Sequence, residues 1–289
     1  MELRHLLYFT TVAQRLNFSR AADELHVAQP AISQQIKVLQ RELGVQLFDR
    51  VGGKVALTQA GEALLPHANR ILAAVETARH VVTELGTLTR GTASLGAPPT
   101  VSGQLLPALL ARFKRTYPGL EVTLREAGTE RLLKLIEAGE LDLAIVVTDR
   151  LPAVVEQQPF LQEHYVLAVS AHHPLAKARG VRLADLAGEP FILFPDSYKL
   201  REVTLAACRT AGFEPKVALD GGAMQSALEF VAAGLGVALV PELALRRARG
   251  VRGVPIADQN LARNLGVVWR KGHYLSPAAR ALRDFLVPR

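Results

Sequence analysis

The sequence predicts an α+β protein with a small N-terminal helical domain that carries a β-hairpin, one long connecting helix, and a larger α/β domain in two lobes. Three observations support this prediction. The 289 residues exceed one typical domain. Two short helical patterns, separated by a three-residue break, occur within the first 58 residues. From Gly91 onward, strand patterns rich in valine and leucine alternate with helical patterns, as in α/β domains.

The composition argues against a disordered or membrane-spanning chain. Hydrophobic residues make up 49% of the chain and charged residues 21%, a balance typical of folded proteins. The longest apolar runs, such as residues 230–240, are too short to cross a membrane. Polar residues interrupt the apolar N-terminus, so we expect no secretory signal peptide. The single cysteine, Cys208, excludes a disulfide within the chain and fits a cytoplasmic location.

The net charge of +7 is compatible with an anionic partner but does not locate its binding site. Residues 1–58 hold seven basic and five acidic side chains, a balance of only +2. Any nucleic-acid site in this segment must therefore depend on where individual side chains are placed.

Residues 17–44 contain two helical patterns on either side of a short break. Ser19 is suited to cap the first helix, and Pro30 fits the first position of the second, where its missing N–H costs nothing. Gly44 tolerates the left-handed conformation and so suits the end of the second helix. The core-facing stripe of that helix, at spacings of four, three and four, is Ile32, Ile36, Leu39 and Leu43.

The opposite face of the second helix is polar. A helix, a short turn and a helix with a polar flank are typical of a helix-turn-helix, whose second helix lies in the major groove of DNA. Glutamine pairs with adenine through two hydrogen bonds, while lysine and arginine suit phosphate. From spacing alone, the solvated face of an ordinary helical hairpin remains an equal alternative. The polar face consists of Gln29, Pro30, Ser33, Gln34, Lys37 and Arg41.

Residues 47–58, "LFDRVGGKVALT", predict two short strands around Gly52 and Gly53, a β-hairpin. Such a wing places Arg50 and Lys54 beside a phosphate backbone. Thr58 is then suited to cap the following helix.

The run "FSRAADELHVAQPAISQQIKVLQRELGVQLFDR…VALTQAGEALL" closely resembles the N-terminal winged helix-turn-helix of LysR-type transcriptional regulators, over about the first 65 residues. One departure is Gln40, where the family usually has glutamate; we expect this position to be exposed and unimportant. The resemblance implies base contacts from the leading edge of the second helix and backbone contacts from its flank and the wing. The DNA-binding set is Ser19, Gln29, Pro30, Ser33, Gln34, Lys37, Arg50 and Lys54.

Residues 59–90 predict one long helix that links the two domains, with a kink or missing hydrogen bond at Pro66. Its apolar stripe could pack on the chain's own regulatory domain or on a second copy. The resemblance favours a dimer seam, and implies that dimers pair into a homotetramer. The stripe, about three heptads long, is Leu64, Ala68, Ile71, Val75, Ala78, Val82 and Leu85.

Residues 91–289 resemble the LysR-type effector domain, which is similar to two-lobed periplasmic binding proteins of type II. "LLPALLARFKRTYPGLEVTL", "GELDLAIV", "HPLA" and "AAGLGVALVPE" carry that likeness. We predict lobe I at residues 91–161 and 266–289, and lobe II at residues 162–265. The first helix of this domain is expected at residues 103–116.

In open α/β sheets, ligands bind beyond the carboxyl ends of the strands, where helix N-termini favour an anion. We therefore expect a small-molecule effector, anionic in character, in the cleft between the lobes. Each serine or threonine at a helix start is equally well explained as a plain cap. The effector-binding candidates are Thr100, Ser102, Thr129, Thr148, Pro195, Ser197, Gly221 and Gln225.

Other signals indicate neither an enzyme nor a metal or cofactor site. Some LysR-type regulators sense peroxide with a cysteine pair, but here Lys199 stands where the reactive cysteine would be, and Cys208 matches the second position only. His172 and His173 are adjacent and cannot easily share one metal. No nucleotide-binding glycine motif or catalytic triad is visible, so an enzyme with an added DNA-binding domain is disfavoured.

The sequence thus predicts a LysR-type transcription regulator that binds double-stranded promoter DNA, itself and a small co-inducer. RNA polymerase is a possible further partner. A periplasmic solute-binding protein would require a signal peptide and would not need residues 1–58. Whether the regulator is an activator or a repressor is not encoded in these patterns.

Overall fold

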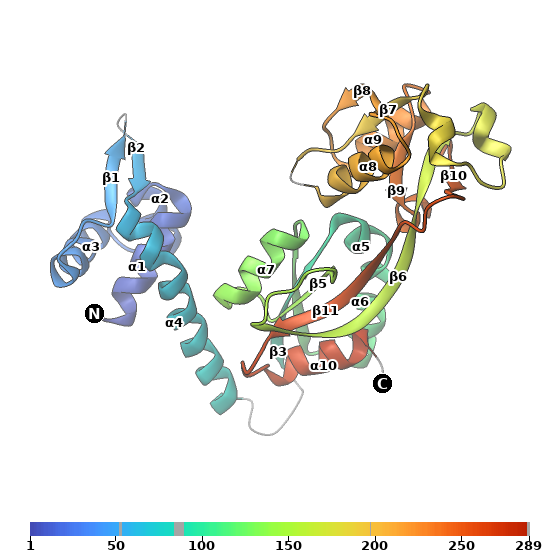
Figure 1. Cartoon of the computed structure of the whole chain (residues 1–289). Coiled ribbons are helices and arrows are strands. Elements are labelled where there is room, and N and C mark those ends of the chain that lie inside the picture. Colours follow the sequence, from blue (N-terminus) through green and yellow to red (C-terminus); the bar gives the residue numbers. More distant parts are fainter. Residues whose placement is uncertain (52–53, 84–89, 197, 288–289) are drawn as a thin grey trace.

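The computed structural model describes residues 1–51, 54–83, 90–196 and 198–287 (Figure 1). The N-terminal domain is a cluster of three helices with a β-hairpin that projects from it. Its elements are α1 (Leu3–Arg15), α2 (Phe18–Leu25), α3 (Gln29–Leu43), β1 (Phe48–Val51) and β2 (Lys54–Leu57).

The predicted cap at Ser19 is wrong, because helix α2 begins earlier. Asn17 is the capping residue, and its Oδ1 accepts a hydrogen bond from Arg20 N at 3.1 Å. Ser19 is an exposed residue inside the first turn. The start of α2 is set by Phe18, whose ring packs against Phe48 with 5.6 Å between centroids.

Helix α3 follows the predicted pattern with two corrections. Pro30 is its second residue rather than its first, because the helix begins at Gln29. Leu43 does not join the buried stripe: it is 39% exposed, since it lies in the last turn, directly before Gly44. Ile32, Ile36 and Leu39 are buried, and Gly44 ends the helix at φ +72° as predicted.

The predicted hairpin and the predicted helix cap at Thr58 are both confirmed. Strands β1 and β2 pair antiparallel from Phe48–Leu57 to Val51–Lys54. Thr58 Oγ1 accepts a hydrogen bond from Gly61 N at 3.1 Å and so caps helix α4 (Gln59–Thr83).

Helix α4 continues through Pro66, and its first half belongs to the core of the N-terminal domain. Ala68 is fully buried there, while Ile71 and Ala78 are exposed. The predicted apolar stripe therefore divides between the chain's own domain and the surface. Its last residue, Leu85, and the side chain of Val82 lie outside the described part of the chain.

The C-terminal domain is built on one seven-stranded sheet, which contains the long strands β6 and β11, and on a smaller two-stranded sheet. The main sheet has the order β10-β6-β11-β5-β3-β4, and β9 also pairs with β6. A two-stranded sheet, β7-β8, bridges to Val237 beside β9. The strands are β3 (Gly91–Ala97), β4 (Leu120–Glu126), β5 (Leu143–Val147), β6 (Val155–Ser170), β7 (Pro190–Leu193), β8 (Lys216–Asp220), β9 (Ala238–Pro241), β10 (Val251–Pro255) and β11 (Ala262–Arg270).

The predicted single helix at 103–116 is wrong: two helices occupy this segment. The first begins at Pro99, and the break falls at Leu105, because Pro107 has no N–H to continue the helical hydrogen bonds. The helices are α5 (Pro99–Gln104), α6 (Leu106–Thr116), α7 (Thr129–Ala138), α8 (Lys199–Thr210), α9 (Met224–Ala232) and α10 (Pro277–Leu286), with 3₁₀ turns η1 (Pro174–Lys177), η2 (Leu183–Leu186) and η3 (Glu242–Leu245).

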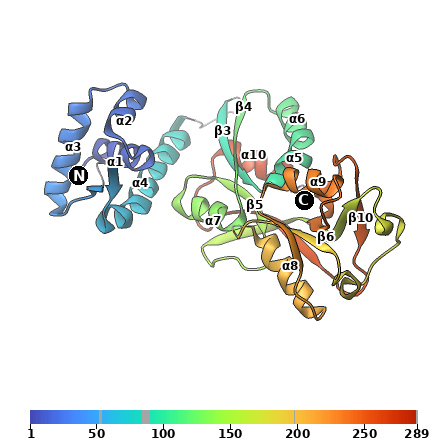
Figure 2. The ribbon, with the colours of Figure 1, turned by 90° about the horizontal axis from the view of Figure 1, so that it is seen from above.

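The two lobes have separate cores and are joined by β6 and β11 (Figures 1 and 2). Between the cores these strands pair directly, Glu163 opposite Arg263 and Gln162 opposite Asn264. Leu265, which the sequence prediction gave to lobe II, packs in the core of the first lobe. Among the described residues, no helix is long and apolar enough to span a membrane.

Candidate DNA-binding and effector-binding sites

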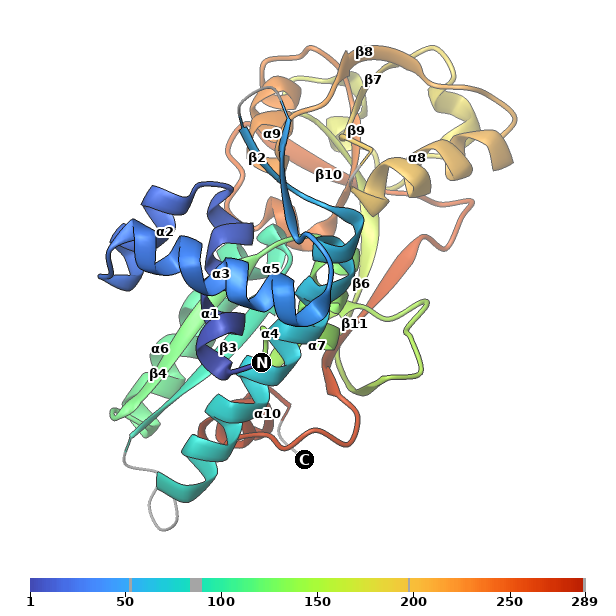
Figure 3. The same ribbon diagram turned by 90° about the vertical axis from the view of Figure 1, so that its left-hand side faces the viewer.

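The polar flank of α3 lies at the surface. Gln29, Pro30, Gln34 and Lys37 are exposed, and Ser33 is half-buried. Gln29 Nε2 donates a hydrogen bond to Ser33 Oγ at 2.8 Å, which lines up two candidate base contacts. Helix α3 lies on the side of the molecule away from the C-terminal domain (Figures 1 and 2), and Figure 3 views it from that side. The flank is therefore open to a partner as large as a DNA duplex.

The inner side of α3 is held to α1 by a buried histidine that sequence reasoning missed. His5 is 4% exposed, and its Nδ1 accepts a hydrogen bond from Glu2 N at 3.3 Å. Its Nε2 therefore carries the hydrogen and donates to Gln35 Oε1 at 2.8 Å. This bond fixes the rotation of α3 about its axis.

The expectation for Gln40 is wrong, because this side chain is half-buried and bonded. Gln40 Oε1 accepts hydrogen bonds from Leu47 N at 2.8 Å and Phe48 N at 3.3 Å. A glutamate has an acceptor oxygen at the same place, which explains how both residues suit this position.

The wing carries one described basic candidate. Arg50 is exposed on β1, and its main-chain N donates to Asp49 Oδ1 at 2.7 Å. Lys54 opens β2 opposite Val51, but its side chain lies outside the described residues.

An apolar surface runs along α1 and α4. Leu3 and Leu7 are 46% and 42% exposed and lie one turn apart on α1, while Ile71 and Ala78 are exposed on α4. On another side, α4 contacts its own C-terminal domain, where Asn69 Nδ2 donates to Glu140 Oε1 at 2.8 Å. Helix α4 thus has surface both for its own C-terminal domain and for a second copy of the chain.

The effector candidates in the first lobe meet a buried ion pair on the strands that join the lobes. Arg263 lies 2.6 Å from Glu163, and both are almost completely buried. Arg263 Nη2 also donates to Thr100 Oγ1 at 3.0 Å, and Glu163 Oε2 accepts from Leu243 N at 3.0 Å. Sequence reasoning missed this pair, although each charge stands in an otherwise apolar strand pattern.

None of the first-lobe hydroxyls is a plain helix cap. Thr129 Oγ1 accepts from Val147 N at 3.2 Å, and Thr148 Oγ1 donates to Asn264 O at 3.2 Å. Helices α5 and α7 have no side-chain cap. Ser102 is 5% exposed, and its Oγ has no hydrogen-bond partner among the described residues. Ser102 is therefore the first-lobe candidate whose hydroxyl neither donates nor accepts a hydrogen bond among the described residues.

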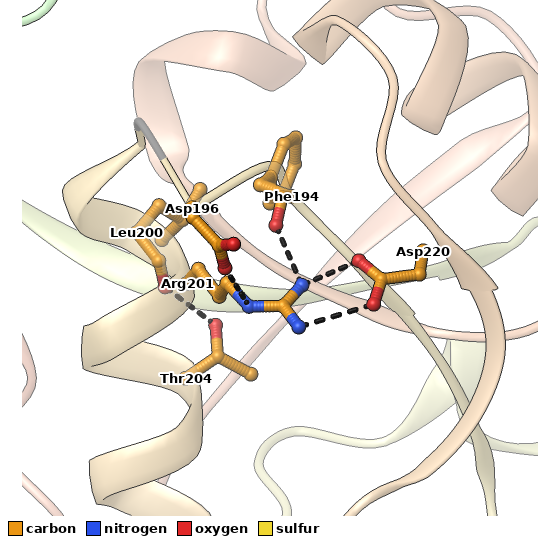
Figure 4. A network of polar contacts seen from close by, with 6 residues as sticks. All are labelled: Phe194, Asp196, Leu200, Arg201, Thr204 and Asp220. Carbon is orange, nitrogen blue, oxygen red and sulfur yellow. Dashed lines mark hydrogen bonds and ion pairs between the residues drawn. The ribbon is translucent and has the colours of Figure 1, made fainter.

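Arg201 on α8 is bonded to Phe194 and Asp220, which directly precede the second-lobe candidates Pro195 and Gly221 (Figure 4). Arg201 Nε lies 2.9 Å from Asp196, Nη1 donates to Phe194 O at 2.9 Å, and Nη2 donates to Asp220 Oδ2 at 3.0 Å. The hydrogen bond from Arg201 holds the pKa of Asp220 below its ordinary value. This network ties together the two loops that follow β7 and β8.

Two of the second-lobe candidates, Pro195 and Gly221, lie on these loops, and Gln225 lies in the first turn of α9. Pro195 is half-buried, and Gly221 N donates to Leu193 O at 3.0 Å. Gln225 is exposed and bonds Glu229 on its own helix at 3.0 Å. Ser197 lies outside the described residues. The described effector candidates thus lie partly in one lobe and partly in the other.

Two surface hollows lie elsewhere. One of about 540 Å³ is lined by Arg90, Lys114 and Glu121 among others, and one of about 390 Å³ by His164, Tyr165 and residues 255–261. Neither includes a predicted effector residue.

The described residues hold no group of three or more metal-ligating side chains. His173 caps η1 through Nδ1, which accepts from Leu175 N at 3.2 Å.

Cys208 is fully buried on α8, and burial raises the pKa of its thiol to about 11. Lys199 begins the same helix and is paired with Glu202. Cys208 therefore presents no accessible, ionised thiol, and residue 199 is a lysine and carries no sulfur.

Both domains of the chain match known protein-family models. Residues 3–62 match the model of bacterial regulatory helix-turn-helix proteins of the lysR family, and residues 86–289 match the LysR substrate-binding domain. The chain belongs to the LysR family. It is therefore a DNA-binding transcription regulator with an effector-binding domain, and not an enzyme, because the members of this family are regulators.

Characterised LysR-family relatives are similar over the whole chain. The transcriptional dual regulator GltC of Bacillus subtilis is 37% identical, over 99% of this chain and 97% of its own length. The dual regulator OxyR of Escherichia coli K12 is 34% identical, over 100% and 96%. The crystal structure of full-length CbnR complexed with its target DNA has a TM-score of 0.72 at 27% identity, over 99% of each chain.

Proposed function

We propose that the regulator reads promoter DNA with the polar flank of α3. Gln29, Ser33 and Gln34 contact base edges, while Lys37 and Arg50 contact phosphates. The observation that carries this proposal is the exposure of the flank on the side facing away from the effector domain. Ser19 and Lys54 complete the proposed contact set. A DNA partner also implies a cytoplasmic protein.

We further propose that two copies pair through α4, with the exposed apolar side chains of α1 at the edge of that interface. A twofold dimer places two α3 helices one helical turn of DNA, or a multiple, apart. Pairing of two such dimers gives the homotetramer. Activation or repression then depends on how the tetramer bends the promoter and presents itself to RNA polymerase.

The proposed effector is a small molecule with one anionic group, bound between the lobes, and no other cofactor is needed. The charges near the candidate loops are already paired: Arg263 with Glu163, and Arg201 with two aspartates. Backbone N–H groups and the free hydroxyl of Ser102 are therefore the proposed ligands, rather than an arginine. Such a ligand changes DNA binding only by its different affinity for the two lobe arrangements.

The test of DNA binding is a gel-shift titration on the DNA upstream of the chain's own gene, at several salt concentrations. We expect specific binding by an oligomer, with log affinity falling linearly with log salt. A folded protein that binds this DNA no better than an unrelated duplex contradicts the proposal.

The effector site is tested by screening small carboxylates, with matched amides, for a shift in thermal unfolding. Ser102→Ala should abolish the shift and leave the unliganded melting temperature unchanged, because Ser102 Oγ has no partner to lose. Ser226→Ala, at an exposed serine on α9, is the control.

A further inference from the structure

A side chain of α3 is hydrogen-bonded to the segment that leads into the wing of this regulator. The carboxamide oxygen of Gln40 accepts hydrogen bonds from Leu47 N and Phe48 N, the two main-chain groups where the chain turns into β1. Leu47 is 1% exposed, so water cannot replace a lost acceptor there. The orientation in which β1 leaves the helical core is therefore set from α3.

The opposite side of the same segment rests on α4. Thr58 Oγ1 donates to Gln46 O at 2.6 Å, and Thr58 N donates to Leu47 O at 3.1 Å. A Cβ at Gly61 would lie 2.2 Å from Leu47 O, so only glycine allows this approach. The root of the wing is thus held between the DNA-reading helix and the linker helix.

Phe48, the first residue of β1, packs against the helical core on a third side of this segment. Its ring lies 5.5 Å from that of Phe9 on α1 and 5.6 Å from that of Phe18 on α2. Arg50 follows two residues later on the same strand, opposite Val55. A strand fixed at its first residue fixes the direction of the side chains that follow it.

We propose that Gln40 is a positioning residue for DNA binding: it holds the wing, and with it Arg50, at a fixed place relative to the base-reading flank of α3. Gln40 does not contact DNA. It determines whether the phosphate contact of the wing and the base contacts of α3 are made at the same time. This inference rests on the proposed phosphate contact of Arg50.

The experiment uses the full-length protein and compares Gln40→Met, Gln40→Glu and Gln46→Met. Methionine has nearly the shape of glutamine but no carbonyl acceptor, and glutamate keeps an acceptor oxygen. Gln46 is an exposed glutamine in the loop between α3 and β1. Operator affinity is measured at several salt concentrations for each variant, with and without Arg50→Ala. Thermal unfolding is recorded in parallel, and the concentration of folded protein is used for every affinity.

We expect Gln40→Met to weaken operator binding about tenfold and to lower the salt slope by about one phosphate contact. Gln40→Glu and Gln46→Met should bind as the unmodified protein does. Adding Arg50→Ala to Gln40→Met should cost little more, because the wing contact is already lost.

Additive losses from Gln40→Met and Arg50→Ala, or an unchanged salt slope in Gln40→Met, would overturn the assignment of Gln40 while leaving the wing contact intact. If Arg50→Ala alone binds as tightly as the unmodified protein, both the wing contact and the role of Gln40 are wrong. Base reading by α3 is unaffected by either result, since it is tested by substitutions on the flank itself.

Discussion

The flank of α3 and the effector loops differ in how their polar groups are used. On α3, most candidate side chains are exposed, and a hydrogen bond joins Gln29 to Ser33. In the effector domain, Thr100, Thr129 and Thr148 are engaged with Arg263, Val147 and Asn264. The proposed DNA-binding flank is thus largely exposed, whereas three of the proposed first-lobe effector residues already bond within the protein.

This difference has an energetic consequence. Substitutions on the α3 flank remove contacts to DNA and leave the folded chain intact, because exposed side chains contribute little to stability. Substitutions in the effector network disturb the fold, because buried groups lose their partners. Stability and DNA binding can therefore be separated by position.

The largest expected effect is that of Arg263→Met. It leaves Glu163 as a buried charge without its partner, which costs about 3–5 kcal/mol. Urea unfolding of the full chain measures the loss. The double variant with Glu163→Gln should recover part of it, because no unpaired charge remains. A loss below about 1 kcal/mol would mean that the two lobes are not held by this pair.

Gly61→Ala should have the next largest effect, and it tests whether the DNA-reading unit is rigid. The new Cβ would meet Leu47 O at 2.2 Å, and overpacking of this kind costs about 1–3 kcal/mol. Gly103→Ala on α5 is the matched control, since nothing lies within 4 Å of its Cβ position. Equal unfolding midpoints for the two variants would show that Leu47 moves away from the new Cβ without a measurable loss of stability.

Ser33→Ala should change DNA specificity by about 1–3 kcal/mol and stability by less than about 0.5 kcal/mol. Ser33 lies on the outer flank and is half-buried, so its loss leaves no buried group unpaired. Competition binding between operator and random duplex measures the specificity ratio. Gln46→Ala, at an exposed glutamine outside the flank, should change neither quantity. An equal loss on both DNAs would assign Ser33 to backbone contact.

Much of the N-terminal domain was predictable because local rules decide it. Glycine after α3, threonine before α4 and paired glycines in the hairpin each specify one conformation from a short stretch of sequence. The errors have tertiary causes. Ser19 and Asn17 are both good caps, and the burial of Phe18 selects Asn17.

The polar contacts of the effector domain were less accessible to sequence reasoning. Thr100 and Arg263 are separated by 163 residues and meet only because β11 returns beside α5. Gln40 was misjudged for a different reason: its partners are nearby in the sequence, but they are main-chain atoms, which carry no sequence signal. The pattern of strands and helices located the hydroxyl side chains at strand ends. It did not identify the groups that form hydrogen bonds with these hydroxyls.

The smallest effect is expected at Cys208, which matches the second cysteine of the LysR-type regulators that sense peroxide and therefore invites a redox test. Burial raises the pKa of this thiol to about 11 from an ordinary value of 9.0, so at pH 8 about a hundredfold fewer thiolates form than on an exposed cysteine. Labelling by a disulfide reagent should therefore be slow in the folded protein, accelerate as pH rises toward 11, and become fast in urea. Hydrogen peroxide should leave operator binding unchanged, as should Cys208→Ser. Rapid labelling of the folded protein at pH 7, or a peroxide response that Cys208→Ser removes, would show that the effector domain opens around α8.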